Sequence, residues 1–551
     1  MKKKEISNER IKGDYLYILL ITLIWLITYI ICSIAWKQNI GWDETSYLST
    51  AKGIAQDFDF SSRFNSVLGL IKYSFPQHTH HYPVYSTYLA IFFKLFGVSL
   101  NVAYFSTWLA GLVACVFIYL IMLLLTENDK LFSFFIAVSF LFLPRIINYC
   151  DTAMMEIPGC ALIMIFSYFV FKDISKNKLN PFLLAIASLW LYFYKSLFIG
   201  AVIGFIFLIL IAYKLKSINL VLKNKLSFPQ SLGIYFGTVS VIYIIFTKFV
   251  FLPLAPMMTF HPRQIQEGTY ADFAGGFFHN PINNALLNMK SFFQNVISHF
   301  YPSFPVFLYP GEEGYYIPSA NWCELGLFFL VFVYVIIFSF LAWRNLSSLN
   351  KVFTLFTVIS IVSFNLIFIL LATSCVGLCC RYNMIYTPLL LILASIHLRE
   401  FLLKDKIRAY IVILTFLVLV YVPFFISEIK VGEWSKGYYS DIARKNTQVV
   451  SNVLGDSKPM FIYFNNGIHT IWVSYPTRTI IYEATNALLK QINLKLSKPI
   501  EYLFLQPENI LFKENEDSIL KGEPIIDHTY TFHSVDTENK VVIYKYNPEL
   551  F

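Results

Sequence analysis

The sequence predicts a polytopic α-helical membrane protein with a small α/β domain at its C-terminal end. Two observations lead to this fold class. Of the 551 residues, 57% are hydrophobic and 14% are charged, whereas soluble domains carry about 25% charged residues. Long apolar runs recur up to residue 427, after which charge rises and short strand-like runs appear. Such a chain cannot build a water-soluble surface, so most of its surroundings must be lipid.

The apolar runs set the expected membrane spans, since a bilayer requires about 20 apolar residues per helix. The first run is too long for the apolar part of a signal peptide, so we interpret it as a retained helix. The short runs 181–194 and 196–213 could instead form one bent unit. Eleven spans are expected, near residues 15–36, 101–125, 131–149, 154–172, 181–194, 196–213, 231–252, 323–343, 351–373, 378–397 and 408–427.

Basic residues gather in alternate connections between these spans. They precede the first span and follow the fourth, sixth, eighth and tenth. Because cytoplasmic loops carry an excess of lysine and arginine, we expect the N-terminus in the cytoplasm. The long connections 37–100 and 253–322 then lie on the outer side. The low charge and the lack of organelle signals fit the inner membrane of a bacterium.

Two domains are expected, a transmembrane module over residues 1–427 and an extracytoplasmic α/β domain over residues 428–551. The first outer loop contains an amphipathic segment, "YPVYSTYLAIFFKLFG" (82–97), which we expect in the membrane interface. In the second domain a helical stretch near 436–454 precedes the strands. The expected strands are residues 460–465, 478–484, 501–506 and 540–546.

The first outer loop begins with an acidic pair in "GWDETSYLST" (41–50). Asp43 and Glu44 follow closely on an apolar helix, in an aromatic setting. A carboxylate at a membrane surface is a candidate general base or metal ligand. The plainer interpretation is that Asp43 caps a helix that begins near Thr45.

Two further charged residues lie at the outer ends of apolar runs. Glu156 is a few residues inside the fourth run, where a carboxylate is costly and usually faces a polar cavity or a partner. An interfacial position is the alternative, and nearby Asp151 is expected to be exposed and structural. Lys195 is an exception to the distribution of basic residues, because it falls on the expected outer side. It either extends to the interface or supplies a cation for a bound phosphate.

Arg381 and Tyr382 lie at the outer mouth of the tenth span. The guanidinium fork of arginine matches phosphate oxygens in a two-point fashion, and an interfacial anchor is the alternative. Candidate metal ligands without diagnostic spacing are His80, His81, His261, His279 and His299. A cysteine cluster is interpreted as apolar filler, although a disulfide or a metal site stays open: Cys375, Cys379 and Cys380.

In this order the motifs resemble the polytopic GT-C glycosyltransferases of the protein mannosyltransferase and aminoarabinose transferase type. The resemblance covers roughly residues 10–400, and Val84 stands where a second proline is usual. It is carried by "WDE" (42–44), "HHYPVYSTYLAIFFKLFG" (80–97), "DTAMMEIPG" (151–159), "YKSLF" (194–198) and "RYNMIYTPLL" (381–390).

The resemblance implies a transferase that moves a sugar from a polyprenyl-phosphate-linked donor to a lipid, glycan or protein acceptor at the outer membrane face. Asp43 would be the base or would orient the acceptor, Glu44 is the second choice, and Glu156 would assist. The departing phosphate would be held by Lys195, Arg381 and Tyr382. Members of this family differ in their need for a divalent metal. If one is used here, its expected ligands are Asp43, Glu156 and His81, and no other cofactor is expected.

A transporter or flippase of a lipid-linked glycan precursor is the alternative function. Transporters often show internal repeats and broken helices in matching halves, and the sequence shows neither. A non-enzymatic assembly subunit would have no reason to gather carboxylates and cations on one face. Membrane lipids are expected partners, and nucleic acid is not.

Overall fold

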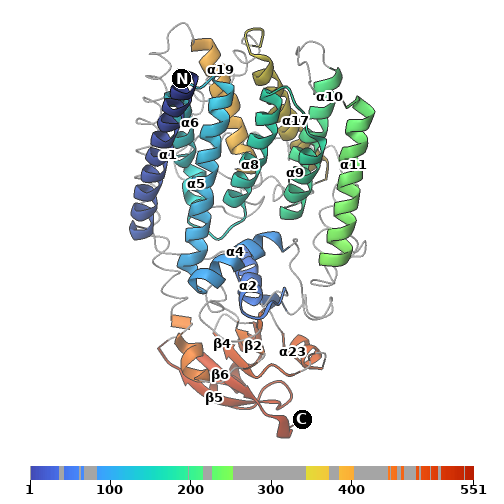
Figure 1. The fold of residues 1–551 in the computed structure, drawn as a ribbon. Helices are drawn as coiled ribbons and strands as arrows, with labels where there is room; N and C mark the ends of the chain where they lie inside the picture. Colours follow the sequence, from blue (N-terminus) through green and yellow to red (C-terminus); the bar gives the residue numbers. More distant parts are fainter. Residues whose placement is uncertain are drawn as a thin grey trace, which may run out of the picture.

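A computed structural model of the chain has three tiers, a layer of long helices, an intermediate pair of helices and a β-sheet (Figure 1). The two termini lie at opposite ends of the molecule (Figure 1). The residues that the structure describes are 2–35, 42–60, 64–66, 83–195, 198–214, 226–251, 343–371, 384–402, 445–446, 448–455, 459, 461–464, 479–482, 485–494, 496, 498–506, 510–538 and 540–550.

Four helical segments within this described part are long and apolar enough to cross a membrane: Tyr15–Ile34, Leu100–Leu125, Glu156–Ser175 and Phe228–Val250. The helices of the upper layer are α1 (Lys2–Ala35), α5 (Leu100–Leu125), α6 (Lys130–Leu141), α7 (Pro144–Cys150), α8 (Glu156–Ser175), α9 (Pro181–Tyr194), α10 (Ile199–Lys214), α11 (Phe228–Ile245) with the π-helical η3 (Phe246–Phe251), α17 (Ser348–Leu371), and η5 (Met384–Tyr386) with α19 (Thr387–Leu402).

Where the predicted spans fall on described residues, they coincide with helices of this layer, with one correction. The expected helix 131–149 is wrong, because the chain forms α6 and then a separate α7. Pro144 is the first residue of α7, a position where its missing N–H costs nothing and its fixed φ is favourable. Residues 181–194 and 196–213 form two helices, interrupted by an extended residue at Lys195. The spans 323–343, apart from residue 343, and 408–427 lie outside the described residues, as do residues 378–383 of the span 378–397, so a total of eleven stays a prediction.

Helix α5 lies at the centre and contacts α1, α4, α6, α7, α8 and α19. The Trp25 indole N–H of α1 donates to Trp108 O of α5 at 2.7 Å. Helices α10 and α17 pack closely because α10 has glycine at the contact. An ideal Cβ would lie 2.2 Å from Ser360 O at Gly200 and 2.1 Å from Ser360 Oγ at Gly204, as in other small-residue contacts between membrane helices.

The intermediate tier consists of α2 (Trp42–Asp57) and α4 (Val84–Phe96), which pack on each other between the long helices and the sheet (Figure 1). Helix α4 confirms the amphipathic segment expected at 82–97. Its buried side includes Leu89 and Phe93. The Lys94 Nζ lies 3.5 Å from Ala55 O of α2 and ties the two helices together.

The third tier is a six-stranded mixed sheet with the order β1-β3-β2-β4-β6-β5. The strands β1, β3, β2 and β4 run parallel, whereas β6 is antiparallel to both β4 and β5. The bounds are β1 (Phe64–Ser66), β2 (Phe461–Phe464), β3 (Thr479–Tyr482), β4 (Tyr502–Leu505), β5 (Tyr530–Asp536) and β6 (Val541–Tyr546), with α23 (Asn486–Asn493), α24 (Ile510–Glu514), α25 (Glu516–Leu520) and η7 (Pro548–Leu550).

The four strands expected from the sequence are β2, β3, β4 and β6, whereas β1 and β5 were not anticipated. Strand β1 comes from the connection 37–100, so the sheet is not built by residues 428–551 alone. The expected boundary between the two domains lies outside the described residues. Of the helical stretch expected near 436–454, the structure describes residues 445–446 and 448–454, and these are helical.

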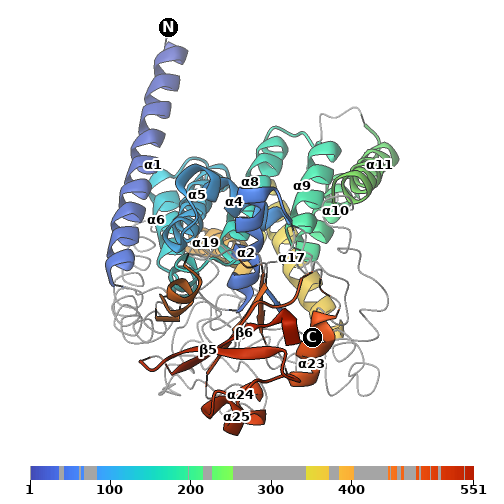
Figure 2. The same cartoon turned by 90° about the horizontal axis from the view of Figure 1, so that it is seen from below.

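The two faces of the sheet belong to different cores. Helices α24 and α25 lie on the side away from α2 and α4 (Figure 2), in a cluster that includes Leu503 and Leu511. The other face, which includes Ile462 and Phe504, joins the same hydrophobic cluster as the long helices and α2.

Candidate functional site

The site is built around the turn between α7 and α8, residues 151–155. Helix α7 ends at Cys150, and Asp151 is its C-cap residue. Helix α8 begins at Glu156. Segments far apart in the sequence hold this turn, α2 from one side and the end of α9 from another. Three of the expected charged residues, Glu44, Glu156 and Lys195, therefore meet here.

Glu44 of α2 holds the turn directly. Its Oε1 accepts a hydrogen bond from the Ala153 backbone N–H at 2.5 Å, and the residue is buried. Helix α2 begins at Trp42, so Asp43 lies inside the first turn and is not the N-cap of a helix that begins near Thr45. That interpretation is wrong. Carboxylates are favourable in this turn because the helix dipole is positive there. The side chain of Asp43 lies outside the described part.

Glu156 and Lys195 form a buried ion pair. Lys195 Nζ lies 2.7 Å from Glu156 Oε1, with exposed fractions of 2% and 0%. Lys195 is the C-cap of α9, and its N–H donates to Leu191 O at 3.0 Å. Buried charges require a partner, and each side chain supplies one for the other. Lys195 therefore does not extend to the membrane interface.

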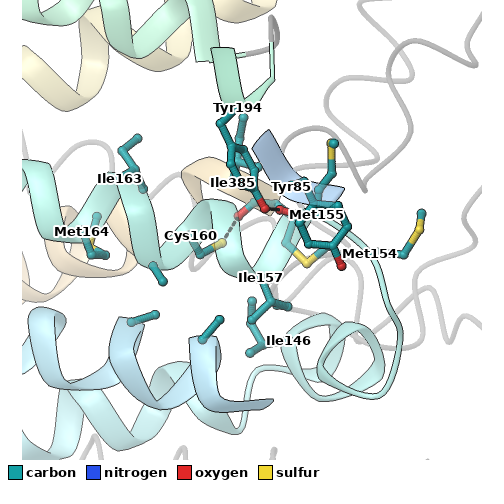
Figure 3. Close-up of a cluster of buried hydrophobic side chains, with 14 of the residues drawn as sticks. Tyr85, Ile146, Met154, Met155, Ile157, Cys160, Ile163, Met164, Tyr194 and Ile385 are labelled. Carbon is teal, nitrogen blue, oxygen red and sulfur yellow. Dashed lines mark hydrogen bonds between the residues drawn. The ribbon is translucent and has the colours of Figure 1, made fainter. Parts of the chain in front are cut away.

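Aromatic side chains surround the turn at Met155. The Tyr194 hydroxyl donates to Met155 O at 2.7 Å, and the Tyr47 hydroxyl lies 3.7 Å from the Met155 sulfur. Tyr85 of α4 completes the group, with its ring 5.2 Å from Tyr47 and 6.0 Å from Tyr194 between centroids. Figure 3 shows Tyr85, Met155 and Tyr194 beside one another.

Tyr85 is a site residue that the sequence did not single out. Its burial raises the pKa of its phenol well above the usual value, and Tyr88 and the carboxylates of Glu44 and Glu156 add to the effect. The phenol therefore stays neutral beside two carboxylates. It lay inside a quoted motif, but nothing in the pattern separated it from the other tyrosines.

A glycine allows the end of α9 to approach α8. A Cβ at Gly159 would lie 2.9 Å from Phe198 Cζ and 3.4 Å from Tyr194 Cε1. Gly159 is three residues after Glu156, so this approach brings the segment around Lys195 against the first turn of α8. The close packing explains how a lysine after one helix reaches a glutamate at the start of another.

Two more buried charged residues, one in the turn and one on α2, were not anticipated. Asp151 is buried, with 4% of its surface exposed, so the expectation of an exposed residue is wrong. Lys52 of α2 is also 4% exposed. It lies eight residues after Glu44, a spacing that places both near one face of the helix. The sequence signal that could have found Lys52 is its place in the connection 37–100, on the side where the distribution of basic residues leads us to expect few lysines.

The other predicted site residues lie outside the described part of the chain: Arg381, Tyr382, His80, His81, His261, His279, His299, Cys375, Cys379 and Cys380. Among the residues that are described, no group of three His, Cys, Asp or Glu side chains could hold a metal ion. The predicted ligand set of Asp43, Glu156 and His81 therefore stays a prediction.

Two solved structures of one protein share this fold. ArnT from Cupriavidus metallidurans bound to undecaprenyl phosphate is 12% identical, with a TM-score of 0.55 over 97% of this chain and 98% of that chain. The apo form of that ArnT gives the same identity and TM-score over 98% of this chain and 99% of that chain. No protein-family model and no curated protein matches. The comparison confirms the fold resemblance expected from the order of the motifs.

Proposed function

We propose that this chain is a glycosyltransferase that moves a sugar from a polyprenyl-phosphate-linked donor to a lipid, glycan or protein acceptor at the outer face of a bacterial inner membrane. One observation carries the proposal. Glu44, Glu156 and Lys195 come from three separate segments and meet around one buried turn. The chain that carries them shares its fold with a protein crystallised with undecaprenyl phosphate.

Lys195 is the proposed partner of the donor phosphate. When the bond between the sugar and the phosphate breaks, negative charge grows on the leaving phosphate, and a fixed cation in a water-poor site stabilises that charge by about 3–4 kcal/mol. Glu156 already balances the charge of Lys195, so the phosphate needs a second cation. Arg381 is the proposed source, and Tyr382 adds a hydrogen bond.

Asp43 is the proposed base toward the acceptor. The neighbouring Glu44 carboxylate accepts the Ala153 N–H, which gives it a role in holding the turn. Asp43 precedes it in the first turn of the same helix, at the membrane face where the acceptor would arrive. A positioned base contributes about 10²–10⁴-fold to the rate. It would take the proton of the acceptor hydroxyl as that oxygen attacks the anomeric carbon.

Glu156 is proposed to orient Lys195 and the turn. A divalent metal ligated by Glu156 would lie beside the Lys195 ammonium, which is 2.7 Å from Glu156 Oε1, and two cations in a buried site repel each other. No step of the proposed mechanism is therefore assigned to a metal, and Glu156 as a metal ligand stays a prediction.

The test is donor consumption by the purified protein in lipid nanodiscs. Labelled polyprenyl-phosphate hexoses and pentoses are offered with an envelope extract as acceptor, and released polyprenyl phosphate is measured. We expect Asp43→Asn to reduce turnover by about 10²–10⁴-fold while the protein stays folded. Asp57→Asn, an exposed carboxylate at the other end of α2, is the matched control. Absence of donor consumption by the wild-type protein would overturn the function, and normal turnover by Asp43→Asn would remove Asp43 from it.

A further inference from the structure

Strand β1 connects the acidic helix α2 to the C-terminal sheet. It follows α2 after only six residues and pairs in parallel with β3, with Phe64 opposite Ile480, Asn65 opposite Ile481 and Ser66 opposite Tyr482. The first outer loop therefore supplies an edge strand to a sheet whose other strands come from residues more than 390 positions later.

The connection between α2 and β1 contains a strained residue. Phe58 has a φ of 56°, in the left-handed region that a bulky side chain avoids. Its N–H donates to Ile54 O at 3.2 Å, an arrangement that ends many helices and normally uses glycine. Strained residues persist where surrounding contacts hold them. Here the chain beyond Phe58 is held by the pairing of β1 with β3.

Helix α2 and one face of the sheet share a hydrophobic core. The face of the sheet that includes Ile462 and Phe464 belongs to the same hydrophobic cluster as Leu48 and Ala51 of α2. The direct connection of α2 to the sheet is through β1, the strand that follows it. At its other end, Glu44 is bound to the turn at Ala153.

We propose that the C-terminal sheet is a positioning element of the site. By taking β1 as its edge strand, it holds α2 against the turn between α7 and α8 and so fixes Asp43 and Glu44. Phe64 and Asn65 are the positioning residues, through their backbone. The positional part of this proposal is independent of the proposed function, and only its effect on turnover rests on that function.

The test disrupts the backbone pairing of the edge strand β1 and compares the effect with the same disruption of β5, the strand at the opposite edge. In a parallel strand the N–H groups of successive residues point to opposite sides, so one of two adjacent residues donates to the neighbouring strand. The double variant Phe64→Pro/Asn65→Pro therefore removes an N–H that faces β3. The matched control is Thr531→Pro/Phe532→Pro in β5, the strand at the opposite edge of the same sheet.

Amide hydrogen exchange of the full-length protein in nanodiscs is measured on peptides from α2. We expect the β1 variant to speed exchange in α2 by at least about tenfold, since local opening there becomes easier, whereas the β5 control leaves α2 protected. Equal effects of the two variants on α2, or full protection of α2 in the β1 variant, would overturn the proposal. This result does not depend on any sugar transfer.

Turnover supplies the second readout. We expect the β1 variant to lower kcat by about 100-fold, because a misplacement of about 1 Å has this effect on chemistry, with the donor KM within twofold of wild type. The β5 control keeps its kcat. A rise in donor KM with unchanged kcat would contradict a positioning role of the sheet. A wild-type protein without transfer activity would overturn the proposed function and leave the exchange result to decide this proposal.

Discussion

Glu156 Oε1 lies 2.7 Å from Lys195 Nζ in a site where both side chains are buried. The two residues are 39 positions apart, at the start of α8 and the end of α9. The pair is thus both a joint between two helices and the proposed phosphate contact. Stability and activity should respond differently to its removal.

Glu156→Gln should destabilise the protein by about 3–5 kcal/mol, because it leaves the Lys195 ammonium buried without its counter-charge. The double variant Glu156→Met/Lys195→Met should recover most of that stability while it stays inactive, because a buried ion pair can be replaced by apolar side chains of similar size. Thermal unfolding in detergent checks both. A double variant with wild-type turnover would show that the pair is structural only.

Glu44→Ala should destabilise the protein by about 1–3 kcal/mol, because the Ala153 N–H is left buried without an acceptor. Glu44→Gln should be mild, since the amide oxygen can still accept this hydrogen bond. Unfolding and turnover are measured for both variants. If Glu44→Gln stopped transfer without a change in stability, Glu44 rather than Asp43 would be the base.

Tyr194→Phe should cost about 1 kcal/mol, the usual net value of a buried hydrogen bond. The loss should stay small because Met155 O also accepts the Gly159 N–H at 2.9 Å. Tyr15→Phe is the comparison, because Tyr15 of α1 is 67% exposed. Chemical denaturation would give both values, and a larger loss for Tyr15→Phe would contradict this ranking.

Gly204→Ala should destabilise the contact between α10 and α17, because its Cβ would lie 2.1 Å from Ser360 Oγ. Adding Ser360→Ala should restore part of the stability, since it removes the clashing atom. Gly233→Ala on α11 is the matched control, because a Cβ there meets nothing within 4 Å, and alanine favours the helix by up to about 1 kcal/mol. Equal melting temperatures for Gly204→Ala and Gly233→Ala would refute the close packing.

The helical layer was predictable because a lipid environment demands long apolar runs, which can be counted. The interruption before α7 was missed because Pro144 lies within a continuous apolar run. Strand β5 was missed because four of its seven residues are polar, and β1 because three loop residues carry no pattern. Their pairing with distant strands is a tertiary property that local patterns do not contain.

The site was predictable only as a set of separate charges. Glu156 and Lys195 stood out because each is costly at its position, but nothing in the sequence indicated that each is the partner of the other. The partner of Glu44 is a backbone N–H, which no residue type reveals. Asp151 was misjudged because burial in a turn depends on the segments that cover it.

The account depends most on a donor phosphate bound at Lys195. Native mass spectrometry of the protein with added polyprenyl phosphate tests this directly, with wild type compared with Glu156→Met/Lys195→Met. We predict a stable complex with the wild-type protein and binding at least about tenfold weaker in the double variant, as expected for loss of a charge-assisted contact. Equal binding by the folded double variant would contradict the account.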